Sequence, residues 1–258
     1  MGDVINNRKR IWNDLTVWFA ENQPYMSLCV SEHEQLLKYG YSIPEGCIFA
    51  SGKYILYSPD HVAYGYEIVI LFPSDYPSSY PSVICTDSDL PPNLHRHILT
   101  GGQACLGLVT ELYQIWSAGP NIDNFARNVI SPFIAWQLHY ETFGSAPPWG
   151  ERRHGIYGYV DFFTDFISKI TRIDPQTIEK LITQKNVPKK RRKCPCGAKR
   201  QFRYCHGKFI YPIRKIFHAY CNQASEEMKM STTDFVLKVY GVIIACLQKT
   251  SVILLAII

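Results

Sequence analysis

The 258-residue chain lacks the signatures that would assign it at once to a secreted, repeat or nucleotide-binding class. Its first ten residues, MGDVINNRKR, contain no apolar run of the kind that begins a secretory signal, so we expect a cytoplasmic protein. No internal repeat is visible. The chain has neither a glycine-rich nucleotide-binding element nor a metalloprotease signature, so we do not expect it to activate a substrate with a nucleotide by itself.

An uninterrupted apolar run of membrane-spanning length is also missing. The segment Phe235 to Ile258 is strongly apolar, but Lys238 and the polar stretch Gln248 to Ser251 divide it into runs of about 9 and 7 residues. A helix needs about 20 apolar residues to cross a bilayer. We expect a packed helix or pair of strands here, with a tail on or in a membrane as the alternative.

The chain does contain a large apolar fraction. Hydrophobic residues make up 47% and aromatic residues 14%, which excludes extended disorder. A chain of this length holds one domain with an appendage or two small domains. Six of the nine cysteines stand apart from one another, so we expect reduced thiols rather than a disulfide scaffold.

The first half of the chain has the pattern of an α+β fold. Apolar residues recur at helical spacing from Val4 to Asn22, which predicts an amphipathic helix. Three β-branched and aromatic runs then predict strands at Tyr54–Tyr57, Tyr64–Phe72 and Ser82–Cys85. These strands follow one another without intervening helices, so we expect local antiparallel hairpins rather than a doubly wound sheet.

Helical patterns dominate the remainder. A helix is predicted to begin at Asn121 or Asp123 and to bend or restart near Pro132. The sequence YVDFFTDFISKI, from Tyr159, predicts a second helix. DPQTIEKLI predicts a third, with Asp174 as its cap and a proline in its first turn.

The segment HRHILTGGQACLG, from His95 to Gly107, carries the strongest catalytic signal. A catalytic cysteine acts as a thiolate, which nearby imidazolium or backbone N–H groups favour. His95 and His97 could supply the first of these to Cys105, and the glycine pair Gly101-Gly102 permits the close backbone approach needed for the second. A structural thiol and an incomplete metal site are the alternatives.

The surrounding motifs resemble the ubiquitin-conjugating enzymes. The family's FPxxYPxxxP turn is matched by Phe72, Pro73, Tyr76, Pro77 and Pro81. His95-Arg96-His97 stands where the family has His-Pro-Asn, and Gly102-Gln103-Ala104-Cys105-Leu106 matches its Gly-x-x-Cys-Leu, with the interval of eight residues preserved. IWSAGPNID resembles its Trp-Ser-Pro step. The resemblance spans Val4 to Phe143.

This resemblance implies an N-terminal helix, an antiparallel meander sheet and C-terminal helices, with a protein C-terminus carried as a thioester on Cys105 and passed to an amine. His97 replaces the family's Asn and is expected to serve the oxyanion or act as an acid-base group, or else to order the loop through a carbonyl. His95 is expected to be structural, as in the family. A non-catalytic scaffold of the same fold and a Cys-His hydrolase are the alternatives.

Two departures from the family's pattern bear on the expected donor and acceptor. Arg96-His97 in place of Pro-Asn resembles bacterial members from antiphage operons of the cyclic-oligonucleotide-based signalling type, which implies a cGAS-like nucleotidyltransferase as donor. The acceptor would be a protein or small amine, and the donor must be activated elsewhere or arrive in another activated form. The interval from Cys105 to Trp116 is 11 residues, a few longer than is usual, which could reshape acceptor access.

A second candidate site lies in CPCGAKRQFRYCHG, where the spacing C-x-C-x8-C-H places four zinc-type ligands within 13 residues. The stretch resembles the SEC-C motif, although it is one residue short after Gly197. We expect structural zinc, held by a set of four ligands: Cys194, Cys196, Cys205 and His206. Reduced thiols in a basic loop are the alternative.

Basic residues surround this cysteine cluster. Between Lys189 and Arg203 they are interleaved with Phe202 and Tyr204, a pattern that suits an acidic partner protein or nucleic acid phosphates. Taken together, these patterns divide the chain into three regions. We expect a ubiquitin-conjugating-like domain at 1–145, a helical extension or linker at 146–187, and a region at 188–258 that holds the SEC-C-like motif and the apolar segment.

Overall fold

The computed structural model divides the chain into two compact units, Met1–Glu151 and Arg152–Ile258. The residues that it describes are 2–57, 63–148, 153, 155–184, 191–221 and 238–239. The predicted packing of Phe235 to Ile258 therefore lies outside the described residues, except at Lys238 and Val239. Within the described ranges, no helix combines the length and apolar character that crossing a membrane requires.

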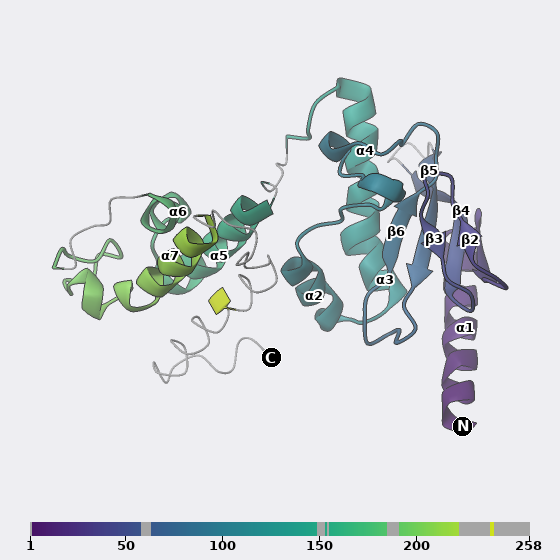
Figure 1. Cartoon of the computed structure of the whole chain (residues 1–258), viewed down its shortest axis with the longest axis horizontal. Coiled ribbons are helices and arrows are strands. Elements are labelled where there is room, and N and C mark those ends of the chain that lie inside the picture. The colour runs from purple at the N-terminus through teal and green to yellow at the C-terminus, as the bar shows by residue number, and fades with distance from the viewer. Residues whose placement is uncertain are drawn as a thin grey trace. The chain divides into compact units, whose positions relative to one another are not determined.

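The first unit is built on an antiparallel sheet (Figure 1). Its four strands have the order β1-β4-β5-β6 and span Met26–Val30, Ile48–Tyr57, Ala63–Phe72 and Ser82–Cys85. A small ribbon, β2 (Gln35–Leu36) with β3 (Ser42–Ile43), lies in the connection between β1 and β4. The mixed α+β class and the antiparallel pairing are confirmed.

Burial on both faces explains the apolar sequence of β5. Ile68 and Ile70 are fully buried in a core shared with helices, while Val69 and Leu71 belong to a second cluster with Ile43 of the ribbon. A strand covered on both sides needs apolar residues at consecutive positions rather than at alternate ones. This is why YEIVILF was recognised from sequence.

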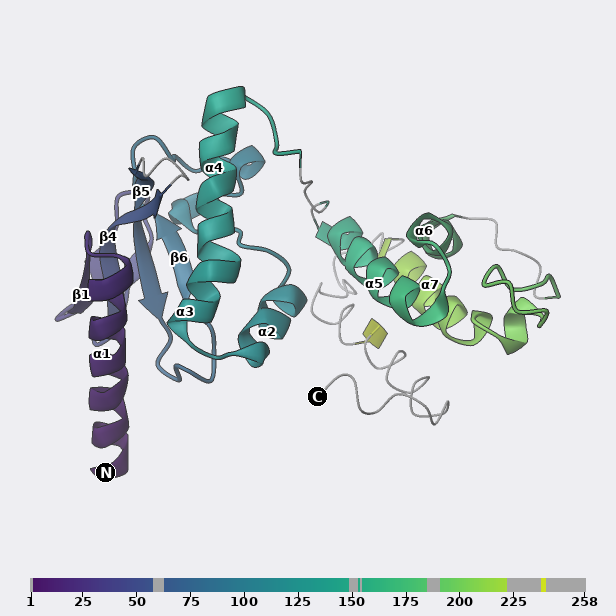
Figure 2. The same ribbon diagram turned by 180° about the vertical axis from the view of Figure 1, so that it is seen from behind.

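Helices cover one face of this sheet (Figure 2). Helix α1 spans Gly2–Asn22 and packs against β1. After α2 (Val109–Ala118) the chain forms one continuous helical stretch, which consists of α3, a π-helical turn and α4: Ile122–Phe125, Ala126–Ile130 and Ser131–Phe143. Helix α4 contacts β4 and β5.

The irregularity predicted at Pro132 is confirmed as that π-helical turn. Proline lacks an N–H group, and its ring crowds the carbonyl four residues earlier, so the backbone widens by one residue before it. Two other expectations were incomplete. Strand β4 begins at Ile48, six residues before the predicted start, and α2 occupies part of a stretch expected to be irregular.

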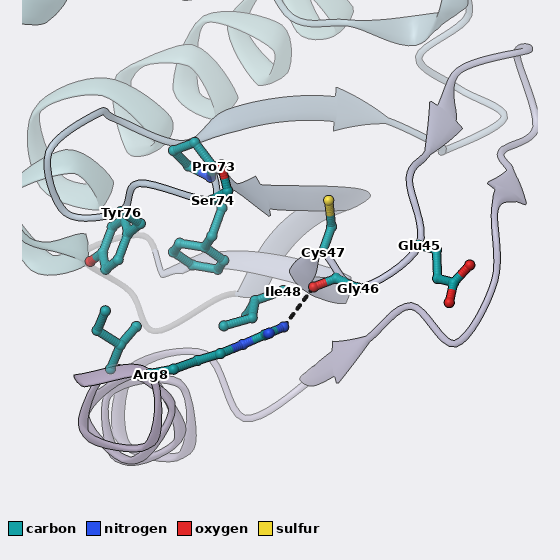
Figure 3. A pocket seen from close by; sticks show the side chains of 10 residues that line it. Arg8, Glu45, Gly46, Cys47, Ile48, Pro73, Ser74 and Tyr76 are labelled. Carbon is teal, nitrogen blue, oxygen red and sulfur yellow. Dashed lines mark hydrogen bonds between the residues drawn. The ribbon is translucent and has the colours of Figure 1, made fainter. Parts of the chain in front are cut away.

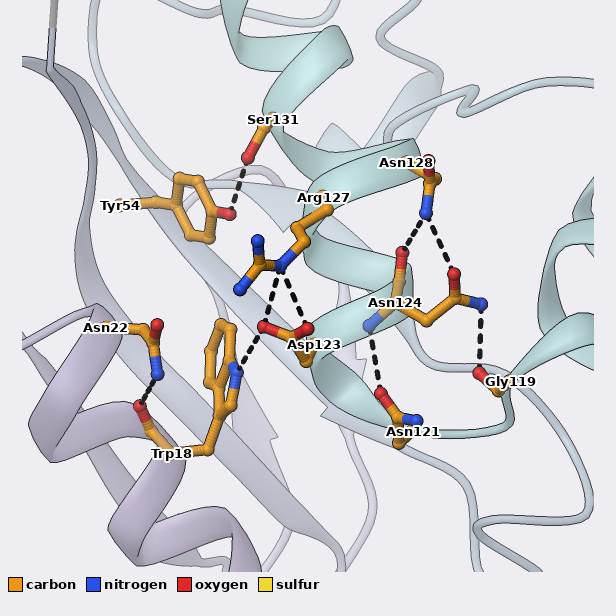
Figure 4. A network of polar contacts seen from close by, with 10 residues as sticks. All are labelled: Trp18, Asn22, Tyr54, Gly119, Asn121, Asp123, Asn124, Arg127, Asn128 and Ser131. Carbon is orange, nitrogen blue, oxygen red and sulfur yellow. Dashed lines mark hydrogen bonds and ion pairs between the residues drawn. The ribbon is translucent and has the colours of Figure 1, made fainter.

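A polar network joins α1 to α3 (Figure 4). The Trp18 indole Nε1 donates to Asp123 Oδ1 at 3.2 Å, and Arg127 Nε donates to both carboxylate oxygens of Asp123 at 2.9 Å. Asn121 caps α3 by accepting from the Asn124 backbone N–H at 2.9 Å. The start of α3 is thereby fixed to the first helix of the chain.

The second unit contains α5 (Gly155–Thr171), α6 (Pro175–Thr183) and α7 (Gly207–Cys221). The cap predicted for α6 is confirmed, because Asp174 Oδ1 accepts from the Thr177 N–H at 2.8 Å and a proline occupies the first turn. Helix α6 contacts both α5 and α7. Arg214 of α7 donates to the carbonyl oxygens at the end of α6, each at 3.3 Å.

Candidate functional site

Cys105 lies at the end of a narrow hairpin that begins at His97. Ile98 and Ala104 form an antiparallel bridge, and the Leu99 N–H donates to the Gln103 carbonyl at 2.8 Å. The Cys105 N–H donates to the His97 carbonyl at 2.7 Å. The backbones of two of the three predicted catalytic residues are therefore direct neighbours across the hairpin.

The glycine pair at the tip fixes this hairpin against the sheet. Both residues have positive φ angles, 84° at Gly101 and 85° at Gly102. A Cβ atom on Gly102 would lie only 2.6 Å from the Cys85 carbonyl oxygen of β6, and the Ala104 N–H donates to the Val83 carbonyl at 2.8 Å. The pair was predicted to bring backbone N–H groups close to Cys105, whereas the close approach that the structure shows is that of Gly102 to the Cys85 carbonyl of β6.

His97 has an unusual backbone and a defined ring contact. Its φ of 56° and ψ of 33° place it in the left-handed region, where Asn, Asp and His are enriched among non-glycine residues. The half-buried imidazole meets Trp136 of α4 edge to face, with 4.9 Å between ring centroids. Asn is enriched in this conformation too, so the backbone here would accept Asn as well as His.

Arg96 connects the site loop to α4, which sequence reasoning missed. Its guanidinium donates to Gln137 Oε1 at 3.0 Å, to the Asp89 carbonyl at 2.9 Å and to Glu141 Oε1 at 3.0 Å. Gln137, which is fully buried, donates back to the Arg96 carbonyl at 2.8 Å. The guanidinium also lies over the Tyr140 ring at 5.5 Å. Its side chain is 11% exposed, so Arg96 is a buried anchor of the loop.

His95 and Cys105, the other two residues predicted to be catalytic, face solvent to different degrees. His95 is exposed, and its backbone N–H donates to Asn93 Oδ1 at 2.9 Å. Cys105 carries a half-buried free thiol. Leu94 and Leu99, which flank His97 along the chain, are 69% and 38% exposed. The thiol thus belongs to a loop that combines solvent access with apolar surface.

The metal cluster predicted from sequence is assembled in the second unit. One ligand atom from each of Cys194, Cys196, Cys205 and His206 lies within 4.8 Å of all the others. The Sγ atom of Cys194 is 3.2 Å from His206 Nδ1, and the Sγ atoms of Cys196 and Cys205 are 3.6 Å apart. Ligands of a tetrahedral ion with metal–sulfur bonds of about 2.3 Å are separated by about 3.8 Å, so the four residues fit one ion.

The backbone explains why these ligands converge. Residues 192 to 202 form a second hairpin, in which the Cys194 N–H donates to the Arg200 carbonyl at 2.9 Å and Gly197 turns with a φ of 78°. Phe202 is fully buried against Tyr211 of α7, with 5.2 Å between ring centroids. Cys205 and His206 follow immediately and lead into α7. The hairpin and the helix together thus provide the four donors.

The charge balance of the cluster favours a cation. Burial, together with the neighbouring thiols Cys196 and Cys194, raises the pKa of Cys205 to about 12, and burial lowers the pKa of His206. Three crowded sulfurs cannot all ionise without a nearby positive charge. A divalent metal ion supplies that charge and stabilises the thiolates.

A separate pocket of about 300 Å³ lies between α1 and the start of β4 (Figure 3). Arg8 of α1 spans its edge and donates to the Gly46 carbonyl at 2.7 Å. Phe72, Pro73 and Tyr76 line its opposite side. The lining includes none of the predicted catalytic residues, so the pocket is distinct from the Cys105 loop.

Together, the fold and sites define an α+β protein with a cysteine-bearing surface loop and a four-ligand cluster able to bind a metal ion. Comparison of the chain with protein-family models, curated proteins and solved structures finds no match.

Proposed function

We propose that the protein is a ubiquitin-conjugating-like transferase that carries a protein C-terminus as a thioester on Cys105. The observation that carries the proposal is the hydrogen bond from the Cys105 N–H to the His97 carbonyl. It holds an accessible thiol beside the three residues that replace the family's His-Pro-Asn. The thiol is half-buried, so part of its surface is open to solvent.

The packing of the other resembling elements supports the same fold assignment. The FPSDYP turn lies against the tryptophan of IWSAGPNID, because Trp116 Nε1 donates to the Pro77 carbonyl at 3.0 Å. The rings of Trp116 and Tyr76 approach to 5.7 Å, and Tyr76 contacts Phe72 at 5.1 Å. Motifs separated by about 40 residues are thus parts of one packed cluster, which supports treating their resemblance as structural.

The reaction consists of two acyl transfers. The Cys105 thiolate attacks the carbonyl carbon of an activated donor C-terminus, a new C–S bond forms and the activating group leaves. An acceptor amine then attacks the thioester, an amide bond forms, the amine loses a proton and the cysteine is released as a thiolate. The sequence shows no nucleotide-binding element, so in this proposal the donor is activated elsewhere or arrives in another activated form.

His97 has two candidate roles in the second transfer. It donates a hydrogen bond to the oxyanion or exchanges a proton with the attacking amine, or it orders the loop that holds Cys105. The contact with Trp136 supports the ordering role, since it fixes the imidazole against α4. Arg96 is a positioning residue in either case, because its contacts hold the loop against the same helix.

For the donor, we propose the C-terminus of a cGAS-like nucleotidyltransferase of a bacterial antiphage system, with a protein or small amine as acceptor. This part rests on the residue types Arg96-His97 alone. We further propose that the ion in the second unit is zinc in a structural role. Three sulfurs and one imidazole form a closed donor set of the kind that zinc prefers, which leaves no coordination position for substrate.

The test is intact-mass analysis of the full chain after co-expression with its genomic neighbours. Wild-type protein is expected to carry an adduct that thiols remove, and the mass of the adduct identifies the donor. Cys105→Ser should carry the adduct as an ester that thiols do not remove, and Cys105→Ala should carry none. His97→Ala is expected to slow transfer to the amine by about 10²-fold if it serves the oxyanion, with His95→Ala as the matched exposed control.

Other outcomes would assign a different function. The absence of any adduct, with the neighbouring proteins active, would favour the non-catalytic scaffold. Cleavage of an amide substrate that depends on both Cys105 and His97 would favour the Cys-His hydrolase. His97→Ala could instead leave the transfer rate of each thioester-loaded molecule unchanged and lower the unfolding temperature. That result would assign His97 to loop ordering.

A further inference from the structure

Charge is distributed unequally between the two units. Residues 1–151 contain 7 Lys and Arg against 15 Asp and Glu, a net charge of −8, whereas residues 152–258 contain 20 against 7, a net charge of +13. Within the second unit, residues 180–225 hold 13 basic residues and no acidic residue. The small overall charge of +5 therefore conceals a strongly basic segment.

The hairpin that carries the metal ligands presents much of this charge to solvent. Cys194 and Phe202 are buried, and the other three ligands are half-buried. The basic side chains between residues 191 and 208 are all exposed: Arg191, Arg192, Lys193, Lys199, Arg200, Arg203 and Lys208. We call these seven residues, together with Tyr204, the basic hairpin surface. No acidic residue lies between them in the sequence to neutralise them locally.

An exposed aromatic ring lies within this surface. Tyr204 is 65% exposed, although its neighbour Phe202 is fully buried. The Arg203 guanidinium lies 4.3 Å from the Tyr204 ring centroid, and its Nε donates to Gln201 Oε1 at 3.1 Å. The metal ligand Cys205 follows directly, so the ring projects from a backbone that is held on both sides. Such a ring is presented for contact rather than packed.

We propose that the basic hairpin surface binds single-stranded nucleic acid. Phosphates are recognised by closely spaced exposed cations, and unpaired bases stack on exposed aromatic rings. An acidic polypeptide would also satisfy the cations, but its carboxylate side chains offer no aromatic face on which Tyr204 could stack. This inference does not require Cys105 to carry an acyl group, so it stands apart from the proposed transferase activity.

The test is fluorescence anisotropy of a labelled 20-nucleotide single strand, titrated with the full-length protein purified with zinc. A plot of the logarithm of the binding constant against the logarithm of the salt concentration is expected to be a falling straight line. Its slope should be about −0.7 for each phosphate contacted. Tyr204→Ala should weaken binding at least about 5-fold and leave the slope unchanged. Lys199→Glu/Arg200→Glu should make the slope shallower by about 1.4. Cys105→Ala should bind as the wild type does.

Matched variants in the first unit test whether the effect is local. Tyr113→Ala removes another exposed tyrosine, 51% accessible, and Lys38→Glu/Lys53→Glu changes the charge by the same amount; neither should weaken binding comparably. The proposal is overturned if no binding occurs at low salt, if a duplex of equal length binds more tightly, or if Tyr204→Ala has no effect. Equal competition by polyglutamate would identify an acidic polypeptide as the partner instead.

Discussion

Two adjacent glycines hold the Cys105 hairpin for different reasons. Gly101 and Gly102 share nearly the same φ angle, so any other residue at either position adopts a left-handed backbone at a cost of about 1 kcal/mol. A Cβ atom at Gly101 would meet nothing closer than 3.8 Å, whereas at Gly102 it would lie 2.6 Å from the Cys85 carbonyl. A side chain at Gly101 therefore introduces backbone strain alone, whereas one at Gly102 adds a steric clash.

We expect Gly102→Ala to lower the free energy of unfolding of the first unit by about 3 kcal/mol, and Gly101→Ala by about 1 kcal/mol. The difference arises because the Cys85 carbonyl belongs to β6 and cannot move without disturbing the sheet. Urea unfolding followed by intrinsic fluorescence measures both values. Equal destabilisation by the two variants would show that contact with Cys85 does not constrain the hairpin.

The residues of the Cys105 site differ in how far they could be predicted. Local spacing indicated that His97 and Cys105 lie near each other, and the structure brings their backbones together in one short hairpin. The role of Arg96 could not be predicted in this way, because Gln137 and Glu141 lie 41 and 45 residues further along the chain. No local pattern around Arg96 indicated these contacts.

Among the secondary-structure elements, those with local signals were the ones recognised from sequence. Helix α6 carries its own cap and first-turn proline, and β5 has a long apolar run. Strand β1 has no run of buried apolar residues, and no side chain caps the N-terminus of α2. Their formation depends on packing against β4 and the rest of the core, which no local pattern records.

The link between α1 and α3 depends on the ionisation of one carboxylate. Hydrogen bonds from Arg127 and then Trp18 hold the pKa of Asp123 below its ordinary value. A carboxylate with a lowered pKa in the folded protein contributes stability above its ordinary pKa, and this contribution is lost as the pH falls through the lowered value. The contribution is therefore present at neutral pH and disappears only below about pH 4.

We expect wild-type protein to unfold about 1 to 3 °C above Asp123→Asn at pH 7, since the side chain is 44% exposed and solvent weakens the ion pair. The difference between the two unfolding temperatures should disappear as the pH is lowered below about 4. Thermal unfolding across this pH range measures it. Asp14→Asn, which alters an exposed carboxylate of α1, is the control and should show no such convergence. A gap that persists in acid would mean that the Asp123 carboxylate does not stabilise the link.

At the scale of the whole molecule, the sheet of the first unit and the ligand hairpin of the second unit depend on different sources of stability. The first has a sheet with apolar clusters on both faces. In the second, the hairpin before α7 contributes the buried side chain of Phe202 but has no strand pairing longer than an isolated bridge. Short segments of this kind often require a metal ion to fold, because ligand binding replaces the missing core.

Removal of the proposed metal ion should therefore affect the ligand hairpin and leave the first unit unchanged. With a zinc chelator, amide exchange of residues 191–206 is expected to rise by more than about 10²-fold, since a structural ion contributes several kcal/mol to the segment that it holds. Peptides from β5 should keep their protection. Cys194→Ser should reproduce the effect, and Cys29→Ser, at a half-buried thiol outside the cluster, should not. Unchanged exchange in protein shown by elemental analysis to have lost its zinc would mean that the four side chains converge without structural need of an ion, and the hairpin would then be held by Phe202 and α7.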